Sequence, residues 1–387
     1  MFAVFNPARK AALIFLALAS AVFLASCDTT IGGGPTINTS KPVPVALLVP
    51  KGSPQSGDAV LAQSLENAAR MAIADLEGVQ IDLRVYDTAG SPATASTVAI
   101  QAVTDGAQII LGPVYAEAAN AVGVAVRNRN VNVLSFSNNP SIAGGNVFVL
   151  GPTFSNTANR LVRYATSQGK SNMLVVHSND VAGQLGRDAI QQATNSAGAQ
   201  IAGSVTYDRS QQGVISAVPQ IRDQVVATGA QAMFTTATTA GALPLLSQLL
   251  PEAGVDPTVT QYIGLTRWDI PAQTLALPGV QGAWFALPDP GVSQRFRTRY
   301  QTAYGGAPHP IGGLAYDGIA AIGALVGAGK SDALTGAALT QAAGFQGVSG
   351  IFRLRGDGTN ERGLAVATIQ NRQVVVIDPA PTSFVGL

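Results

Sequence analysis

The chain has 387 residues, of which 47% are hydrophobic and 12% are charged, and its formal net charge at pH 7 is +1. This balance excludes a strongly basic surface for nucleic acid or for an anionic membrane. One cysteine and two histidines cannot supply a disulfide framework, a thiolate metal site or a histidine-rich metal site.

The N-terminus has the pattern of a secretory signal. Arg9 and Lys10 precede the uncharged apolar segment 11–25, which is shorter than the roughly 20 residues of a membrane span. Residues 24–27, "LASC", resemble the bacterial lipobox, in which the cysteine is lipidated and becomes the first mature residue. We therefore expect a signal peptide at 1–26 and a lipid on Cys27. The alternative is that Cys27 is an ordinary residue of a signal peptide that is cleaved elsewhere.

A Gly/Thr/Pro/Ser-rich segment, 27–42, follows and has the composition of a flexible tether. Lipidation would place the protein in the periplasm of a Gram-negative bacterium, anchored to the inner or the outer membrane through the Cys27 lipid. Removal of residues 1–26 takes away two basic residues and leaves a net charge of about −1.

From residue 43 onward, short β-branched runs alternate with amphipathic segments of helical period. Strand–helix alternation at this spacing predicts an α/β fold with parallel, doubly wound sheets. Strands are expected at 43–50, 81–87, 107–112 and 131–136, and helices at 61–77, 92–104 and 115–128.

The same alternation starts again after residue 152, which predicts a second lobe of the same type. Strands are expected at 172–178, 200–207, 231–237, 259–264 and 281–287, and helices at 155–168, 181–197, 214–227 and 240–250. The last third is less regular. Helices are expected at 293–305, 312–329 and 332–344, and a closing set of antiparallel strands at 350–358, 364–371 and 373–378.

This order resembles the type I periplasmic binding proteins, in particular their leucine/isoleucine/valine-binding branch. The resemblance is carried by "VALLVP" with its Gly/Ser loop, "NAARMAIADL", "YDTAGSPATA", "IILGPVYAEAANAV", "VNVLSFSNNP", "AYDGIAAI" and "GVSGIFRLRGDGTNERG". It implies two Rossmann-like lobes joined by three crossovers, near 153, 287 and 347. Lobe 1 would comprise 43–152 and 288–346, and lobe 2 would comprise 153–287 and 347–380.

Within that family, "VNVLSFSNN", "GAWFALPDP" and the segment 352–381 look most like lipoproteins that activate penicillin-binding proteins. The resemblance implies a non-enzymatic protein whose partner is a peptidoglycan synthase. The alternative is a substrate-binding protein that delivers an amino acid or a related small polar solute to an ABC permease.

The loops that follow strands supply the candidate ligand-binding residues of the cleft, because strand ends and helix N-termini line the cleft in this fold. The expected ligand-binding residues are Ser53, Tyr115, Ser135, Ser137, Asn138, Asn139 and Asn179. The alternative for the serines and asparagines is ordinary turn and cap chemistry, and for Tyr115 it is packing at a helix start. Asp180 is expected to cap the following helix.

Two features usual in amino-acid binders of the family are missing. Gly112-Pro113 is followed by Val114-Tyr115 without a Ser or Thr, and Ala182 occupies a position that often carries an aromatic ring. These departures argue against a free branched-chain amino acid as the ligand. His177 and His309 are far apart, and no catalytic, phosphate-loop or dinucleotide motif is present, so no enzyme, metal or cofactor is expected.

Overall fold

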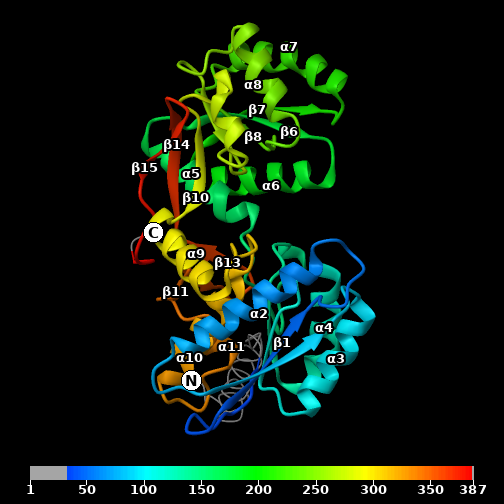
Figure 1. Ribbon diagram of the computed structural model, residues 1–387. Coiled ribbons are helices and arrows are strands. Elements are labelled where there is room, and N and C mark those ends of the chain that lie inside the picture. The colour runs from blue at the N-terminus through cyan, green and yellow to red at the C-terminus, as the bar shows by residue number, and fades with distance from the viewer. Residues whose placement is uncertain (1–32, 386–387) are drawn as a thin grey trace, which may run out of the picture.

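The computed structural model describes residues 33–385, which form two lobes arranged end to end (Figure 1). The predicted signal peptide, Cys27 and the first part of the tether lie outside the described residues. Within 33–385, none of the helices combines the length and the apolar character that crossing a membrane requires.

Lobe 1 is built on a five-stranded parallel sheet in the order β2-β1-β3-β4-β5. Its strands are β1 (Val43–Val49), β2 (Ile81–Asp87), β3 (Ile109–Leu111), β4 (Asn132–Ser135) and β5 (Val147–Val149). Its helices are α2 (Asp58–Ala74), α3 (Pro92–Thr104), α4 (Ala116–Val126), α9 (Pro290–Tyr304), α10 (Gly313–Gly327) and α11 (Gly336–Leu339), with the short 3-10 turns η1 (Arg127–Arg129) and η2 (Pro140–Ile142).

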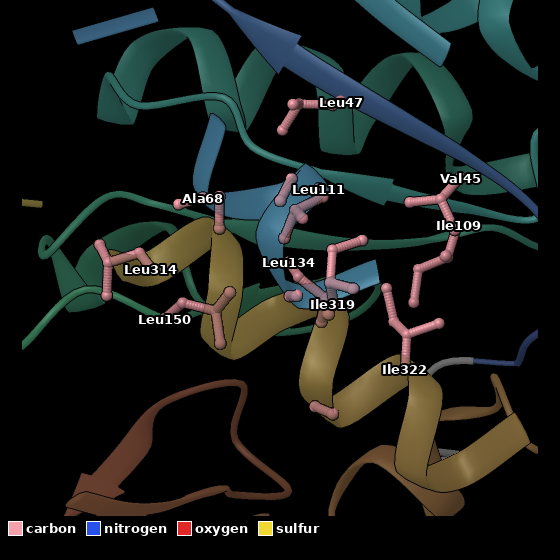
Figure 2. Packing of buried hydrophobic residues seen from close by; sticks show 14 of the residues in the cluster. Val45, Leu47, Ala68, Ile109, Leu111, Leu134, Leu150, Leu314, Ile319 and Ile322 are labelled. Atoms are coloured by element: carbon pink, nitrogen blue, oxygen red, sulfur yellow. The ribbon is translucent and has the colours of Figure 1, made fainter. Parts of the chain in front are cut away.

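Alternate side chains of β1 point to opposite faces of this sheet, so both faces need a helical cover. Val45 and Leu47 pack with α2 and with Ile319 and Ile322 of α10, as Figure 2 shows, whereas Leu48 packs with α3 and α4. The C-terminal third of the chain therefore completes the core of the N-terminal lobe.

Lobe 2 is built on a seven-stranded sheet in the order β15-β14-β10-β9-β8-β6-β7. Its strands are β6 (Asn172–Ser178), β7 (Gln200–Tyr207), β8 (Ala232–Thr235), β9 (Gln261–Gly264), β10 (Trp284–Pro288), β14 (Leu364–Gln370) and β15 (Gln373–Asp378). Its helices are α5 (Phe154–Ser167), α6 (Val181–Ser196), α7 (Gln211–Thr228) and α8 (Leu243–Glu252), with the 3-10 turns η3 (Ala272–Ala276) and η4 (Pro278–Val280). The five strands β6 to β10 are parallel, and β14 and β15 add an antiparallel edge.

A third, small sheet divides the segment 347–380, which the sequence assigns to lobe 2 as a whole. It consists of β11 (Phe345–Gly347), β12 (Gly350–Leu354) and β13 (Asn360–Arg362). Phe352 and Leu354 are buried in the core of lobe 1, so the third crossover lies at Gly363 instead of near residue 347. Accordingly β12 pairs with β11 and β13, and only β14 and β15 join lobe 2.

The helix predicted at 332–344 is wrong over most of its length. Only Gly336–Leu339 is helical, capped by the Thr335 side chain. The helix ends at Thr340, whose hydroxyl donates to the carbonyl of Gly336. A hydrogen bond from a Ser or Thr side chain to the carbonyl four residues earlier weakens a helix. Gly344 then adopts a left-handed φ of 68° and turns the chain into β11.

A buried ion pair of lobe 1 lies beside the first and third crossovers. Arg362 Nη1 lies 3.0 Å from Asp317 Oδ2, and the two side chains are 5% and 1% exposed. The Arg362 Nε and Nη2 groups also donate to the carbonyl of Leu150, at 3.2 and 2.5 Å. Burial raises the pKa of the Asp317 carboxyl, while Arg362 and the Val348 N–H oppose that shift. The pair thus ties the first and third crossovers to α10.

Candidate functional site

The carboxyl edge of the lobe 1 sheet presents a buried carboxylate at the point where the strand order reverses, between β1 and β3. Ligands of open α/β sheets bind at such switch points. Asp58, the first residue of α2, is 5% exposed, and the Tyr115 hydroxyl donates to its Oδ1 at 2.5 Å. The other oxygen, Oδ2, has no hydrogen-bond partner among the described residues.

The single phenolic proton of Tyr115 is therefore held by Asp58. Burial raises the pKa of Tyr115 to about 12, and the hydrogen bond to Asp58 adds to this shift. Tyr115 stays protonated at neutral pH, but its proton faces the protein's own carboxylate. It cannot donate the same proton to a ligand carboxylate.

The two serines at the end of β4 are bonded within the protein. Ser135 is fully buried and its hydroxyl donates to the carbonyl of Pro113, while it accepts the N–H of Ser137. Ser137 is 5% exposed and accepts the N–H of Asn139. The structure thus gives both serines a turn-forming role.

The remaining predicted residues are divided between different places. Asn138 is exposed and Asn139 is half-buried, and both line the space between the lobes. Ser53 is half-buried in the loop after β1, where its hydroxyl accepts the N–H of Gln55. Asn179 donates to the Asp208 carboxylate and lines neither the hollow of lobe 2 nor the hollow between the lobes.

Lobe 2 carries a hollow of about 490 Å³ at the carboxyl edge of its sheet. Hydroxyl groups from the ends of successive strands line it, namely those of Ser178, Tyr207, Ser210, Thr236, Thr238 and Thr266. The Thr238 side chain is exposed and makes no hydrogen bond within residues 33–385. The hydroxyls of Ser178 and Thr266 donate to Asp180 and to the Ala237 carbonyl, whereas the other four donate to no acceptor within residues 33–385. The wall can therefore donate and accept hydrogen bonds without carrying net charge.

The charged groups of this hollow neutralise each other. Asp180 caps α6 by accepting the N–H of Gly183 at 2.9 Å, as the sequence predicts, and Arg209 Nη1 lies 2.9 Å from its Oδ2. The Ser178 hydroxyl, the Gly183 N–H and Arg209 together lower the pKa of Asp180. The hollow therefore favours a ligand without a strong net charge.

A second hollow, of about 730 Å³, continues from the first into the space between the lobes. Both are lined by Phe154, Asp180 and Ala182. On the lobe 2 side α6 adds Val181 and Leu185, which are 73% and 46% exposed. In Figure 1, α6 lies along the side of lobe 2 that faces lobe 1.

Asp58 and most of the hydroxyl wall were missed from the sequence, although the signal was present. Each hydroxyl residue of the wall lies within about three residues of a strand end, which is the criterion that selected Ser53 and Ser135. His177 is 3% exposed, with contacts to the Ser178 carbonyl and the Thr206 hydroxyl, and Trp268 is fully buried in the core. No group of three or more potential metal ligands gathers among residues 33–385.

Comparison with known proteins agrees with this architecture. A family model described as "Periplasmic binding protein" matches residues 42–373. An uncharacterized protein of Rickettsia prowazekii (strain Madrid E) is 27% identical over 167 residues, which cover 42% of this chain and 44% of that protein. The chain thus matches less than half the length of this curated relative.

Similar solved structures share 18% sequence identity with the chain, which supports the fold. One is a Rhodospirillum rubrum protein assigned to branched-chain amino acid ABC transport (TM-score 0.73, covering 87% of this chain and 100% of that one). Another is a branched-chain amino acid ABC transporter periplasmic ligand-binding protein of Burkholderia xenovorans (0.67, 88% and 96%). A third is a Desulfitobacterium hafniense ABC transporter substrate-binding protein in complex with leucine (0.61, 87% and 100%).

Proposed function

Because this chain belongs to the periplasmic binding protein family, we propose that it holds a small polar solute between its lobes and delivers it to an ABC permease. Family membership implies a periplasmic location. The observation that carries the proposal is the row of hydroxyl groups at the carboxyl ends of β6 to β9, which line the 490 Å³ hollow. Small-molecule sites are typically concave cavities of this size in which a few polar groups orient the ligand. Similar structures from ABC transporters support this function over regulation of a peptidoglycan synthase.

We further propose that the ligand is not anchored by a carboxylate at the lobe 1 edge. The Tyr115 hydroxyl donates its hydrogen bond to Asp58, and the Asp58 carboxylate repels a second carboxylate nearby. The ligand class that fits is an uncharged polar or amide-bearing solute, with Asn138 and Asn139 facing it from lobe 1.

Calorimetric titration of residues 33–387 with amino acids, their amides, polyols and short peptides tests the proposal. A ligand at 100 times its Kd adds about 2.7 kcal/mol to the stability of the folded state, so a melting curve gives an independent readout. The Thr238→Val variant should weaken binding about fivefold, because a net hydrogen bond contributes about 1 kcal/mol. The matched control is Thr104→Val, an exposed threonine on α3 of lobe 1. Absence of binding across the panel, or equal losses in both variants, would contradict the proposal.

Activation of a penicillin-binding protein remains a second candidate. The observation that favours it is the altered amino-acid site: Tyr115 is committed to Asp58, and Ala182 provides no ring in the hollow. Stimulation of a peptidoglycan synthase from the same organism by residues 33–387, without any bound solute, would support this candidate. Failure to bind or stimulate any such synthase would remove it.

We also propose that Cys27 anchors the protein to a membrane by its lipid. Mass spectrometry of the protein extracted from membranes should find acyl chains on an N-terminal Cys27. The Cys27→Ala variant should leave the membrane fraction, and its persistence there would contradict the anchor.

A further inference from the structure

The junction of the lobes carries another hollow, of about 250 Å³, which lies outside the cleft. Its walls come from α5 of lobe 2, from the β12–β13 hairpin of lobe 1 and from the chain after β15. It shares no lining residue with either of the two cleft hollows. A ligand here would therefore be distinct from the solute proposed above.

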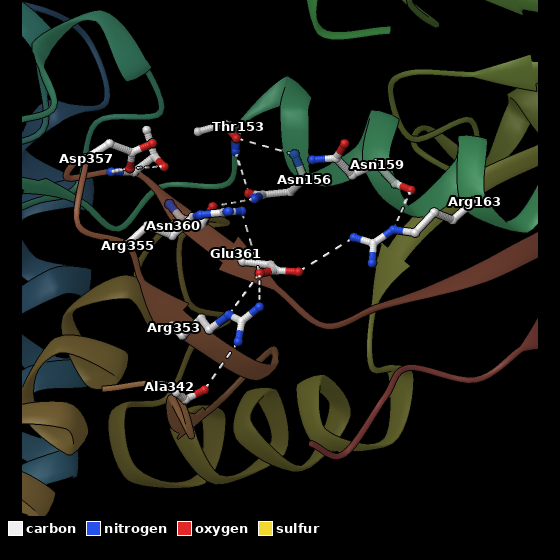
Figure 3. Close-up of polar contacts among 11 residues, drawn as sticks. Thr153, Asn156, Asn159, Arg163, Ala342, Arg353, Arg355, Asp357, Asn360 and Glu361 are labelled. Atoms are coloured by element: carbon white, nitrogen blue, oxygen red, sulfur yellow. Dashed lines mark hydrogen bonds and ion pairs between the residues drawn. The ribbon is translucent and has the colours of Figure 1, made fainter. Parts of the chain in front are cut away.

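Glu361 of β13 lies at the centre of an arginine cluster beside this hollow, as Figure 3 shows. Arg353 Nε and Nη2 lie 2.9 and 2.6 Å from its Oε2. Arg163 Nη2 lies 3.6 Å from Oε1, and Arg355 Nη1 lies 3.7 Å from Oε2. One carboxylate, 14% exposed, thus faces three guanidinium groups, and the cluster has two positive charges in excess.

The other charged side chains of the hollow do not remove this excess. Arg160 forms an ion pair with Asp378 at 2.7 Å, and Arg362 forms one with Asp317. Asp357, in the hairpin turn beside the cluster, accepts from the N–H and the hydroxyl of Thr359 and forms no ion pair with the arginines within residues 33–385. The surplus charge therefore stays on the arginines around Glu361.

Arg163 and Arg355 are the members of the cluster with donors to spare. Their side chains are 45% and 52% exposed. Apart from the long contacts to Glu361, Arg163 donates only to the carbonyl of Asn159, at 3.3 Å, and Arg355 makes no side-chain hydrogen bond within residues 33–385. Arg353, in contrast, is fixed by Glu361, the Ala342 carbonyl and the Phe384 ring.

We propose that this hollow binds an oxyanion with two negative charges, such as a phosphoryl group, between Arg163 and Arg355. The planar fork of an arginine matches phosphate geometry, and a dianion would neutralise the two excess charges. Asn159 and Ser167 line the same hollow and offer uncharged polar groups. Arg163 belongs to lobe 2 and Arg355 to lobe 1, so the anion bridges the lobes beside the crossovers.

Titration of residues 33–387, which keep the buried Ile37 of the lobe 1 core, with inorganic phosphate at constant ionic strength tests the site. The Arg163→Ala/Arg355→Ala variant should bind phosphate at least about tenfold more weakly. Its control is Arg187→Ala/Arg222→Ala, which removes two exposed arginines that pair with neighbouring aspartates and should leave binding unchanged. Glu361→Gln keeps the shape but removes the internal counter-charge, so it should bind phosphate about tenfold more tightly.

The source of the phosphoryl group is assigned by sedimentation with phosphatidylcholine vesicles that contain or lack phosphatidic acid, whose phosphomonoester head group can carry two negative charges. Arginine-dependent binding to the anionic vesicles alone assigns a lipid head group, and binding to inorganic phosphate assigns a free solute. The proposal is wrong if neither binds better than chloride, or if the arginine variants behave as their control. If the double arginine variant misfolds, Glu361→Gln serves as the test. Tighter phosphate binding by this variant would support the proposal, and unchanged or weaker binding would contradict it. Thr238→Val should keep the phosphate site, which separates this proposal from the function of the cleft.

Discussion

Replacement of Arg362 by Met tests the role of the buried ion pair at the crossovers. The substitution keeps the apolar stem but removes three donated hydrogen bonds, two to the Leu150 carbonyl and one to Asp317. Asp317, with a side chain 1% exposed, then keeps a buried charge whose remaining donor is the Val348 N–H at 2.7 Å. Loss of one partner of such a pair costs about 3–5 kcal/mol. We expect the free energy of unfolding to fall by that amount at neutral pH.

The deficit should shrink in acid. Burial raises the pKa of Asp317 in the folded state above its unfolded value, and removal of Arg362 removes an opposing influence. A raised carboxyl pKa stabilises the folded state at low pH, and this stabilisation is lost as pH rises through the folded pKa. The Arg362→Met deficit at about pH 5 should therefore be smaller than at neutral pH.

Urea unfolding followed by far-UV circular dichroism and by tryptophan fluorescence gives the measurement. Trp268 and Trp284 both belong to lobe 2, so the two probes separate a loss in lobe 1 from a global one. The double variant with Asp317→Asn should be more stable than Arg362→Met alone, because no uncompensated charge remains. The control is Arg222→Ala, which removes an exposed ion pair with Asp223 and should change the free energy of unfolding by less than about 0.5 kcal/mol. A cost below about 1 kcal/mol, or simple additivity in the double variant, would refute the reasoning.

Three further predictions concern the cleft. Asp180→Ala should cost about 1 kcal/mol in thermal unfolding at neutral pH. The wild-type carboxyl has a lowered folded pKa, so its stabilisation is lost as pH falls below about 4, and the variant should be less acid-sensitive. Tyr115→Phe should cost about 1–3 kcal/mol by leaving Asp58 without its donor, and ultraviolet pH titration should lose a tyrosine with a pKa of about 12. Gly183→Ala places a Cβ 2.2 Å from the carbonyl that ends β6, so it should lower the melting temperature, whereas the open Gly306→Ala should not.

Much of the fold follows from local patterns. The run 172–178 predicts β6 with its observed bounds, because seven largely apolar residues between polar turns suit a buried parallel strand. The segment 332–344 is rich in residues that favour a helix, but the helix ends at Thr340, and Gly344 turns the chain into β11. A local pattern also does not name the partner of a strand. Phe352 and Leu354 mark β12 as a strand but do not reveal that lobe 1 buries them.

The candidate site was harder to predict because polar residues at strand ends serve two purposes. Ser135 and Ser137 have the expected position, but their hydroxyls bond to the turn itself, which only the three-dimensional structure reveals. Asp58 has the sequence pattern of an ordinary first-turn acid of a helix. Its burial depends on Tyr115, which is 57 residues away along the chain.

The interleaving of the two cores has a consequence for how the chain acquires its structure. Ile319, Ile322 and Phe352 complete lobe 1, and β14 and β15 complete the sheet of lobe 2. Neither lobe can therefore close its core until almost the entire polypeptide is available. An N-terminal fragment that ends before α10 would expose the apolar face of α2 and β1 to water. Nascent chains should thus stay loosely structured throughout synthesis, which is the state in which a polypeptide threads through a translocation channel most easily.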